Sequence, residues 1–296
     1  MLPPQRIAIT GASGLIGSAL VGHLKSEGHT VQRLVRRLPV SPDEIQWEPK
    51  TGYIDIEPMR GVDAVIHLAG AGVEKKRWTK KYKSEILNSR LLGTTTIASA
   101  VAEVKPQVFI SASAIGWYGD SGNRAVVETD RVGDDFLAAV CREWESAADL
   151  AADVRTVKIR TGLVLDPTGG ALGRMLPLFK FGLGGKLGSG KQWWSWITLH
   201  DVIRAIDFAL SHDISGPVNL TSPNPATNQE FTSALARALH RPAVFPVPAI
   251  ALKIALAGFS SEILGSKKVL PQVLIDAGFT WDYPHINVAL EALIED

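Results

Sequence analysis

The chain has 296 residues, of which 46% are hydrophobic and 21% are charged, so it can build a large core. Its 31 basic residues nearly cancel its 30 acidic residues, and no general field draws it to nucleic acid or to an anionic membrane. The single cysteine, Cys141, excludes an internal disulfide framework and a zinc site built from cysteines. No run of about 18 apolar residues predicts a membrane span. We therefore expect a cytoplasmic protein that holds no metal and binds neither nucleic acid nor membrane.

Strand and helix patterns alternate along the first two-thirds of the chain. Short β-branched and apolar runs predict strands at residues 6–10, 29–35, 63–70, 107–113 and 154–162. Apolar residues at helical spacing predict helices at residues 15–28, 82–103 and 134–152. This order predicts an α/β fold, a Rossmann-type doubly wound parallel sheet with helices on both faces. After Pro242 the sequence changes to proline-rich turns and apolar helices, which indicate a smaller C-terminal α/β lobe.

A glycine-rich loop joins the first strand to the first helix. Residues 6–20 read RIAITGASGLIGSAL, with glycines at three-residue spacing. Such glycines permit a tight turn, close approach of the backbone to a pyrophosphate and close packing of helix on strand, and the helix N-terminus offers amide donors. The alternative is a plain tight turn. We expect a dinucleotide to contact Gly11, Ala12, Ser13, Gly14, Leu15, Ile16 and Gly17.

The end of the second strand indicates which dinucleotide is bound. An NAD site of this kind has an acidic residue about 20 positions after the glycine loop, where it binds the ribose 2′-hydroxyl. Val35 holds that position here, and Arg36 and Arg37 follow it. Guanidinium groups are always charged and can bind a phosphate through two hydrogen bonds, so the sequence favours NADP as the cofactor. The alternative is that the two arginines are only the solvated end of a strand.

The motifs resemble those of a known superfamily. The Gly-x-x-Gly-x-x-Gly spacing, DAVIHLAGAG and QVFISAS resemble the extended short-chain dehydrogenase/reductases. The narrower set RWTKKYKSEILNSRLLGT, ISASAIGWYGD, GDDFLAAVCREWE, RTGLVL and LGSKKVLPQVLIDAGFTWDYPHINVALEALI is similar to their atypical, epimerase-like members. The resemblance implies an NADP-binding domain at residues 1–165, with 196–222 returning to it. It further implies a substrate lobe at 166–296 that includes a family-specific C-terminal domain at about 242–296.

In this superfamily a serine positions a substrate oxygen, and a tyrosine four residues before a lysine transfers the proton. Ser113 takes the serine position, but no Tyr-x-x-x-Lys occurs in the chain. The two slots fall at about Leu137 and Cys141, on what reads as an apolar helix face. A cysteine on such a face is expected to pack rather than to act as a nucleophile. Tyr118 has the chemistry of an acid, with a structural role in the cleft wall as the alternative.

Further cofactor contacts are expected where strands end, because ligands of such sheets lie beyond the carboxyl ends of the strands. Glu85 and Arg90 are close enough in helical angle to face the same cleft, although a solvated face with salt bridges is the alternative. The full set of these expected contacts is Leu68, Ala69, Gly70, Ala71, Glu85, Arg90, Ser111, Arg160, Thr161 and Gly162.

Three other features of the sequence also predict roles for particular residues. Residues 182–190, GLGGKLGSG, suggest a mobile flap over the substrate cleft, with the neighbouring Trp193, Trp194 and Trp196 giving either apolar cleft surface or a lobe core. Asp201 is expected to cap a helix. His67 lies in a buried strand, where a core role is expected rather than a catalytic one.

Two functions fit this sequence. The first is an NADP-dependent oxidoreductase or epimerase, a monomer or homodimer, that acts on a small hydroxy or carbonyl compound, sugar-like compounds included, with a non-standard proton donor. Polar residues of the cleft, Ser113, Arg160 and Thr161, favour it. The second is a non-catalytic NADP(H)-binding regulatory protein, which the absent Tyr-Lys pair favours. An open pocket beside the nicotinamide would support the enzyme, and side chains filling that space would support the binding protein.

Overall fold

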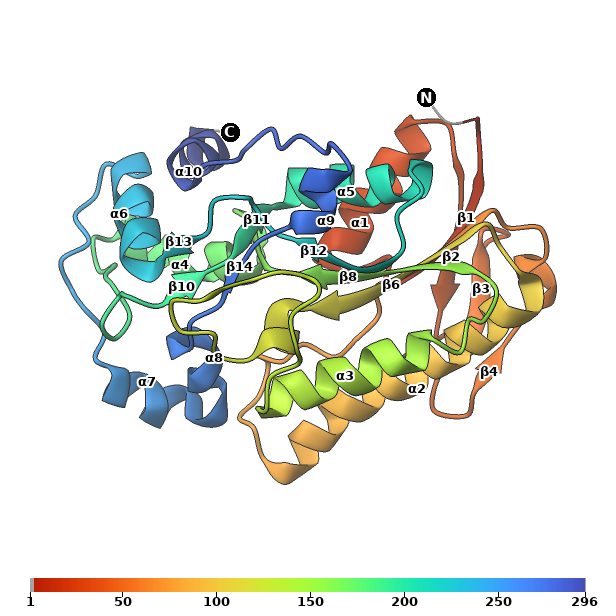
Figure 1. The fold of residues 1–296 in the computed structure, drawn as a ribbon, viewed down its shortest axis with the longest axis horizontal. Coiled ribbons are helices and arrows are strands. Elements are labelled where there is room, and N and C mark those ends of the chain that lie inside the picture. The colour runs from red at the N-terminus through yellow and green to blue at the C-terminus, as the bar shows by residue number, and fades with distance from the viewer. Residues whose placement is uncertain (1–2, 296) are drawn as a thin grey trace.

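An eight-stranded sheet forms the centre of the computed structural model, which describes residues 3–295 (Figure 1). The strand order is β12-β8-β6-β5-β1-β2-β3-β4. All neighbouring strands are parallel except β4, which is antiparallel to β3. The Rossmann-type prediction is confirmed. The strands are β1 (Arg6–Thr10), β2 (Thr30–Val35), β3 (Glu44–Glu48), β4 (Tyr53–Ile54), β5 (Ala64–His67), β6 (Val108–Ala114), β8 (Arg155–Thr161) and β12 (Gly216–Leu220).

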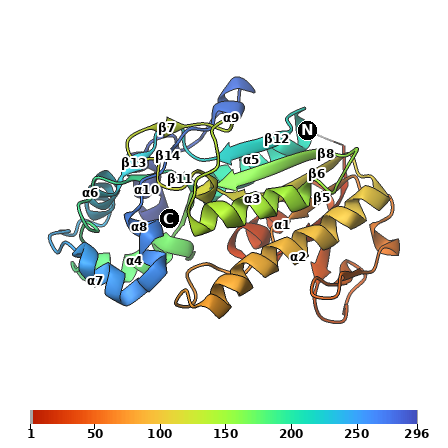
Figure 2. The same ribbon diagram turned by 60° about the horizontal axis from the view of Figure 1, so that its bottom comes forward.

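Helices cover both faces of this sheet (Figures 1 and 2). On one face α1 (Leu15–Ser26) and α5 (Leu199–Ser211) pack on the isoleucine-rich sides of β1, β5 and β6. On the other face α2 (Lys80–Val104) and α3 (Phe136–Ala148) pack side by side. The strand order reverses direction between β1 and β5, so the carboxyl ends of these two strands mark the crevice where such sheets bind ligands.

A smaller lobe lies beyond the carboxyl edge of the sheet (Figure 2). The core of this lobe shows which of the three tryptophans form a lobe core and which could give apolar cleft surface. Trp196 is fully buried and Trp194 packs against Phe231, whereas Trp193 is only partly buried. The elements of this lobe are β9 (Leu163–Asp166), α4 (Gly170–Lys180), β10 (Trp193–Trp194), β11 (Trp196–Thr198), β13 (Ala226–Thr227), α6 (Asn228–Ala238) and α10 (Ile286–Glu295).

The buried side chains after Pro242 pack into two different cores. Leu274 and Phe279 join the core of the large sheet, whereas Leu290 joins the core of the smaller lobe. The segment therefore ties the two parts together. Its elements are α7 (Ala249–Leu256), α8 (Ser260–Leu264), β14 (Lys268–Val269), which pairs with β7 (Ala125–Val126), and α9 (Gln272–Asp276).

Asp201 does not cap α5, because Thr198 is the N-cap and accepts a hydrogen bond from Asp201 N at 3.0 Å. The buried Asp201 carboxylate accepts the backbone N–H groups of Asp282 and Tyr283 and so fastens the C-terminal segment. His200 and Asp282 lie close enough to it to resemble a metal-binding group. The guanidinium of Arg204 already supplies positive charge there, 3.1 Å from both aspartates.

The glycine-rich segment at 182–190 is a packed loop of the smaller lobe. A Cβ on Gly185 would lie 2.0 Å from Phe245 O, and one on Gly184 would enter the Phe179 ring. Gly188 N donates to Val247 O at 2.8 Å. The glycines are therefore required for close packing, and the expected flap over the substrate cleft is not what the structure has.

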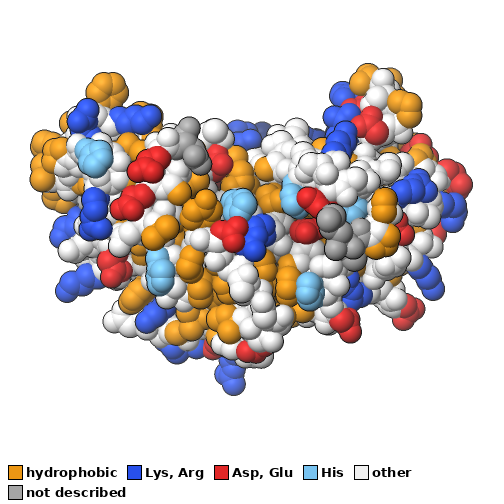
Figure 3. Space-filling view, turned by 90° about the horizontal axis from the view of Figure 1, so that it is seen from above, with side chains coloured by type: hydrophobic (Ala, Val, Ile, Leu, Met, Phe, Trp, Pro, Cys, Tyr) orange, Lys and Arg blue, Asp and Glu red, His pale blue; other side chains and the backbone are white. Residues whose placement is uncertain are grey.

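No helix within residues 3–295 is long and apolar enough to cross a bilayer. On the face seen in Figure 3, basic and acidic side chains are interspersed, in keeping with the formal net charge of +1.

Candidate active site

The glycine loop forms a cradle between β1 and α1. Gly11 has φ +71°, a conformation that favours glycine, and a Cβ there would lie 2.8 Å from the carbonyl carbon of Leu68. A Cβ on Gly17 would lie 2.1 Å from Gly11 O. Gly14, the N-cap, brings no side chain over the end of α1. No side chain of the N-cap therefore covers the first amides of this helix. This arrangement fits the pyrophosphate of a dinucleotide.

A buried hydroxyl joins this cradle to the next loop. Thr10 Oγ1 accepts the N–H groups of Leu68 at 3.1 Å and Ala69 at 3.3 Å. The same oxygen lies 2.7 Å from His67 Nδ1. Because the two lone pairs of the hydroxyl oxygen accept the two amides, the hydroxyl proton of Thr10 is donated to His67 Nδ1. His67 Nδ1 is then an acceptor, and the ring is neutral with its proton on Nε2. Burial lowers the pKa of His67 to about 3, so the ring is part of the core and no acid catalyst.

This histidine makes stability depend on pH. The unfolded ring titrates near 6.5 and the folded ring near 3, so the unfolded chain binds more protons between these values. The contribution of the buried neutral ring to the free energy of unfolding is complete above pH 6.5, and it is lost as the pH falls toward 3. We expect the free energy of unfolding to drop by about 2 kcal/mol between pH 7 and pH 5 through this group. Urea unfolding of His67→Gln should show a flatter pH dependence. His240→Asn is the control, because His240 is exposed with φ 50°, which asparagine also adopts.

The two arginines expected to grip a 2′-phosphate have different surroundings. Arg37 donates to both carboxylate oxygens of Glu44, at 2.7 and 2.6 Å, and the hydrogen bond to Glu44 raises the pKa of Arg37. Arg36 is exposed and, among residues 3–295, has no carboxylate within 4.0 Å. Arg37 is thus committed to the protein, and Arg36 is the guanidinium that remains open to a phosphate.

Arg90 and Glu85 do not face the same cleft. Arg90 Nη1 donates to Ala71 O at 2.9 Å, and its guanidinium lies 4.7 Å from the centre of a Trp144 ring. Burial lowers the pKa of Arg90. Glu85 points to solvent, where it pairs with Lys76 at 3.5 Å. Arg90 supports the loop at residues 68–72 from below, whereas Glu85 belongs to the solvated face that was the alternative.

Ser113, the serine expected to hold a substrate oxygen, is hydrogen-bonded to another side chain of the protein. Ser113 Oγ donates to Glu145 Oε1 at 2.7 Å, and Arg160 holds both oxygens of this carboxylate, at 2.8 and 2.9 Å. The three side chains are almost fully buried. Burial alone would lower the pKa of Arg160, but the hydrogen bonds and charge of Glu145 outweigh it and raise the pKa.

Tyr118 belongs to the same buried network. Its hydroxyl donates to Asn219 Oδ1 at 2.7 Å and accepts from Arg160 Nη1 at 3.0 Å. Burial raises the pKa of Tyr118 to about 12. Glu128, which sequence reasoning missed, accepts the backbone N–H groups of Asn219, Gln272 and Val273 and pins the start of α9. These contacts support the wall role for Tyr118 and leave it poorly suited as an acid.

The other expected contacts at the strand ends are also partly structural. Ser111 is 1% exposed, and Arg160 is 2% exposed within the network, so neither is open to a cofactor. A Cβ on Gly162 would lie 2.6 Å from Ser195 O, so that glycine is needed for packing. Thr161 is half-buried at the strand end. It is the one of these four positions whose side chain the structure leaves partly accessible.

Leu137 and Cys141 fill the place of the missing proton pair. A Cβ on Gly116 would lie 3.3 Å from Leu137 Cβ and 3.4 Å from Cys141 Sγ, so these side chains pack directly on the loop after β6. The Cys141 thiol donates to Ala114 O at 3.6 Å. Burial raises the pKa of Cys141 to about 12, which fits packing and not nucleophilic chemistry.

Next to Leu137 a pocket of about 430 Å³ opens between the amino end of α3 and the α7–α8 region. We call it the cleft pocket. It is lined by Trp78, Lys83, Asp135, Phe136, Leu137, Lys253, Ala257, Gly258, Ser260, Ser261 and Glu262. Sequence reasoning missed it because α7 and α8 come from the C-terminal segment, which no local pattern places beside α3.

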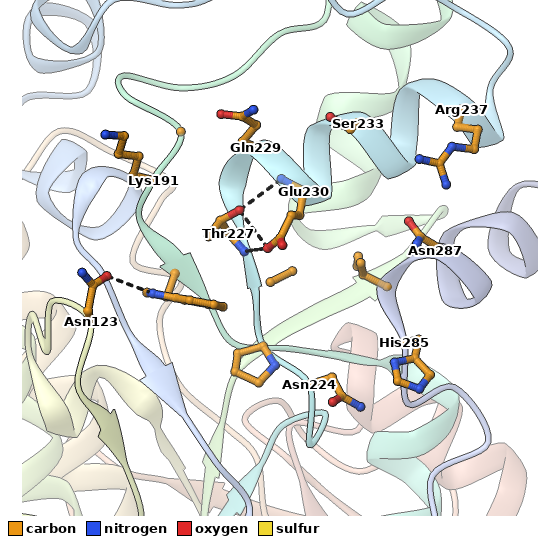
Figure 4. Close-up of a pocket in the computed structure, with 15 residues that line it drawn as sticks. Asn123, Lys191, Asn224, Thr227, Gln229, Glu230, Ser233, Arg237, His285 and Asn287 are labelled. Atoms are coloured by element: carbon orange, nitrogen blue, oxygen red, sulfur yellow. Dashed lines mark hydrogen bonds between the residues drawn. The ribbon is translucent and has the colours of Figure 1, made fainter.

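A second pocket, of about 590 Å³, lies within the smaller lobe (Figure 4). Figure 4 shows Lys191, Gln229, Glu230 and Arg237 around it, with Asn123 bound to the indole N–H of a tryptophan, Trp193. Glu230 is engaged in the capping box of α6. Gly190 and Trp193, which the sequence placed at the substrate cleft, line this pocket, whereas none of the expected cofactor contacts does.

The parallel sheet and its glycine cradle define a dinucleotide-binding α/β protein. The chain belongs to the NAD-dependent epimerase/dehydratase family, whose profile matches residues 7–135, and a domain of unknown function, DUF1731, matches residues 247–293. An epimerase family protein of Mycobacterium leprae is 43% identical over 96% of this chain and 94% of its own length. The resemblance to epimerase-like short-chain dehydrogenases is thereby confirmed.

Solved structures are similar over the same length. The human epimerase family protein SDR39U1, solved with NADPH, is 32% identical with a TM-score of 0.91, covering 98% of this chain and 99% of that one. The nucleoside-diphosphate sugar epimerase from Corynebacterium glutamicum is 35% identical with a TM-score of 0.81, covering 99% of this chain and 59% of that one.

Proposed function

We propose that this protein binds NADP(H) and is an oxidoreductase or epimerase that acts on a small hydroxy or carbonyl compound. The observation that carries the proposal is the cradle of Gly11 and Gly17 under the open amino end of α1, with Arg36 unpaired at the end of β2. The NADPH in the human relative supports the choice of dinucleotide. When bound, such a cofactor supplies hydride transfer, and the protein supplies binding and orientation.

The residues of the chain would divide this work as follows. The first amides of α1 bind the pyrophosphate, and Arg36 binds the 2′-phosphate. The loop at residues 68–72, held by Thr10 and Arg90, forms the wall beside them. The cleft pocket, with Leu137 on its wall, takes the substrate. Ser113 and Tyr118 keep the adjacent loop in place, because their hydroxyl groups are engaged inside the protein.

The test of this function begins with calorimetric titration of the purified protein with NADPH and NADH. Carbonyl-dependent oxidation of NADPH is then followed by its absorbance with a panel of small aldehydes and ketones. NADPH binding together with turnover supports the enzyme. Tight NADPH binding without turnover of any carbonyl compound favours a regulatory NADP(H)-binding protein. The absence of the Tyr-Lys pair also supports this second function. No binding of NADPH at millimolar concentration rejects both.

Arg36→Ala should weaken NADPH binding by about tenfold or more and leave NADH binding unchanged, because a charge-assisted contact to phosphate contributes about 1.5–3 kcal/mol. Calorimetry with both dinucleotides measures this. Arg131→Ala is the matched control, since Arg131 is also exposed but lies far along the chain, after β7. Equal losses for both dinucleotides, or none for NADPH, would remove Arg36 from the site.

A further inference from the structure

The walls of the cleft pocket combine aromatic rings with a fixed cation. Trp78 and Phe136 meet edge to face, with ring centres 5.2 Å apart, and Leu137 and Ala257 extend the apolar surface. Lys83 Nζ lies 4.8 Å from the centre of the Phe136 ring and 5.7 Å from that of the Trp78 ring. Aromatic faces attract a cation at these distances. The ammonium group is therefore held beside the rings, where a ligand stacked on them would meet it.

The acidic side chains of the pocket are already engaged by other groups of the protein. Asp135 Oδ1 accepts the N–H of Ala138 at 2.8 Å and so caps α3. Glu262 Oε2 accepts from Lys267 Nζ at 3.0 Å, and the two side chains are 18% and 8% exposed. Because the helix end and Lys267 balance these two carboxylates, they leave little negative charge for a ligand to meet.

The basic side chains of the pocket have no such partners. Neither Lys83 nor Lys253 has a carboxylate of residues 3–295 within 4.0 Å. The charge left to interact with a ligand is thus positive, and it lies next to an apolar, aromatic wall.

We propose that the cleft pocket binds a small anionic substrate that carries an apolar ring. The ring packs against Trp78 and Phe136, and its carboxylate or phosphate meets Lys83 and Lys253. The volume of about 430 Å³ lies within the usual range of small-molecule sites, about 300–1,000 Å³. This inference rests on the proposed function, which makes the cleft pocket the substrate site, and it adds the chemical class of the substrate.

The test is calorimetric titration of the full chain, saturated with NADPH, with three probes that share one ring system. They are 2-naphthoate, 2-naphthyl phosphate and the uncharged 2-naphthalenemethanol. We expect at least one anion to bind about tenfold more tightly than the alcohol. K83Q and K253Q should each weaken the binding of that anion by about fivefold and leave the binding of the alcohol unchanged. K50Q is the control, because Lys50 is exposed in the turn between β3 and β4.

Three results would overturn the inference. They are equal affinity for anions and alcohol, unchanged anion binding by both K83Q and K253Q, and no binding of any probe at millimolar concentration. NADPH is titrated first into every variant, so that a failure of the proposed function is seen separately. A protein that binds NADPH normally but does not distinguish the probes loses only the proposed substrate class. A preference between the two anions identifies the group that the pocket accepts.

Discussion

Gly17→Ala should abolish measurable NADPH binding and lower the free energy of unfolding by about 3 kcal/mol. The added Cβ would lie 2.1 Å from Gly11 O and 2.9 Å from Ala12 Cα, both backbone atoms of the cradle. Neither can rotate away, so α1 must shift from the loop, at a cost at the upper end of that for overpacking, about 1–3 kcal/mol. The shift also moves the helix amides away from the pyrophosphate. Urea unfolding and calorimetry with NADPH measure the two effects.

Gly22→Ala is the matched control in the same helix. A Cβ on Gly22 has no neighbour within 4 Å, and alanine is the better helix former by about 1 kcal/mol. This variant should therefore be as stable as the natural protein or more stable, with NADPH binding unchanged. If Gly17→Ala behaved like Gly22→Ala, the cradle would not be the cofactor site and the proposed function would lose its main support.

The sheet and the glycine cradle could be predicted because their signals are local in the sequence. Strand and helix periods lie within about 30 residues, and the three glycines stand in the strand-loop-helix context that they require. The end of β2 was predicted only in part. The sequence showed two adjacent arginines, but it did not show that Glu44, at the start of β3, takes Arg37 and leaves Arg36 open.

The remainder of the site depends on contacts between distant segments, which no local pattern encodes. Glu128 accepts the amides of Asn219 and Gln272, 91 and 144 positions away. The cleft pocket forms only because α8 lies near α3. The buried side chains of the C-terminal segment pack partly in the core of the large sheet and partly in the core of the smaller lobe. Ser113 lies within β6, and the engagement of its hydroxyl by Glu145 follows only from the folded position of α3.

The buried network gives the serine of β6 a structural role that needs no Tyr-Lys pair. Ser113, Glu145, Arg160 and Tyr118 form one hydrogen-bonded chain from β6 through α3 and β8 to the loop after β6. The loop carries Trp117, whose ring lies 3.9 Å from the Arg160 guanidinium. Polar groups at this position thus hold the loop after β6 in a fixed shape.

Glu145→Ala should be among the most destabilising single substitutions in the chain. It leaves Arg160, 2% exposed, without the carboxylate that holds it, and breaking such a buried pair from one side costs about 3–5 kcal/mol. Ser113 and Tyr118 lose their order as well, so the loop after β6 loosens. Urea unfolding measures the loss, and near-ultraviolet circular dichroism reports the surroundings of Trp117 and Tyr118.

The double variant Glu145→Leu with Arg160→Met separates the charge from the packing. Removing both charges together leaves no ion stranded in the core, and such replacements are often neutral or stabilising. We therefore expect the double variant to recover most of the stability that Glu145→Ala loses. The exposed pair of Arg60 and Glu103 is the control, because Glu103→Ala should change little. If the double variant were no more stable than Glu145→Ala, the cost would come from the hydrogen bonds that Ser113 and Tyr118 lose and not from the stranded guanidinium.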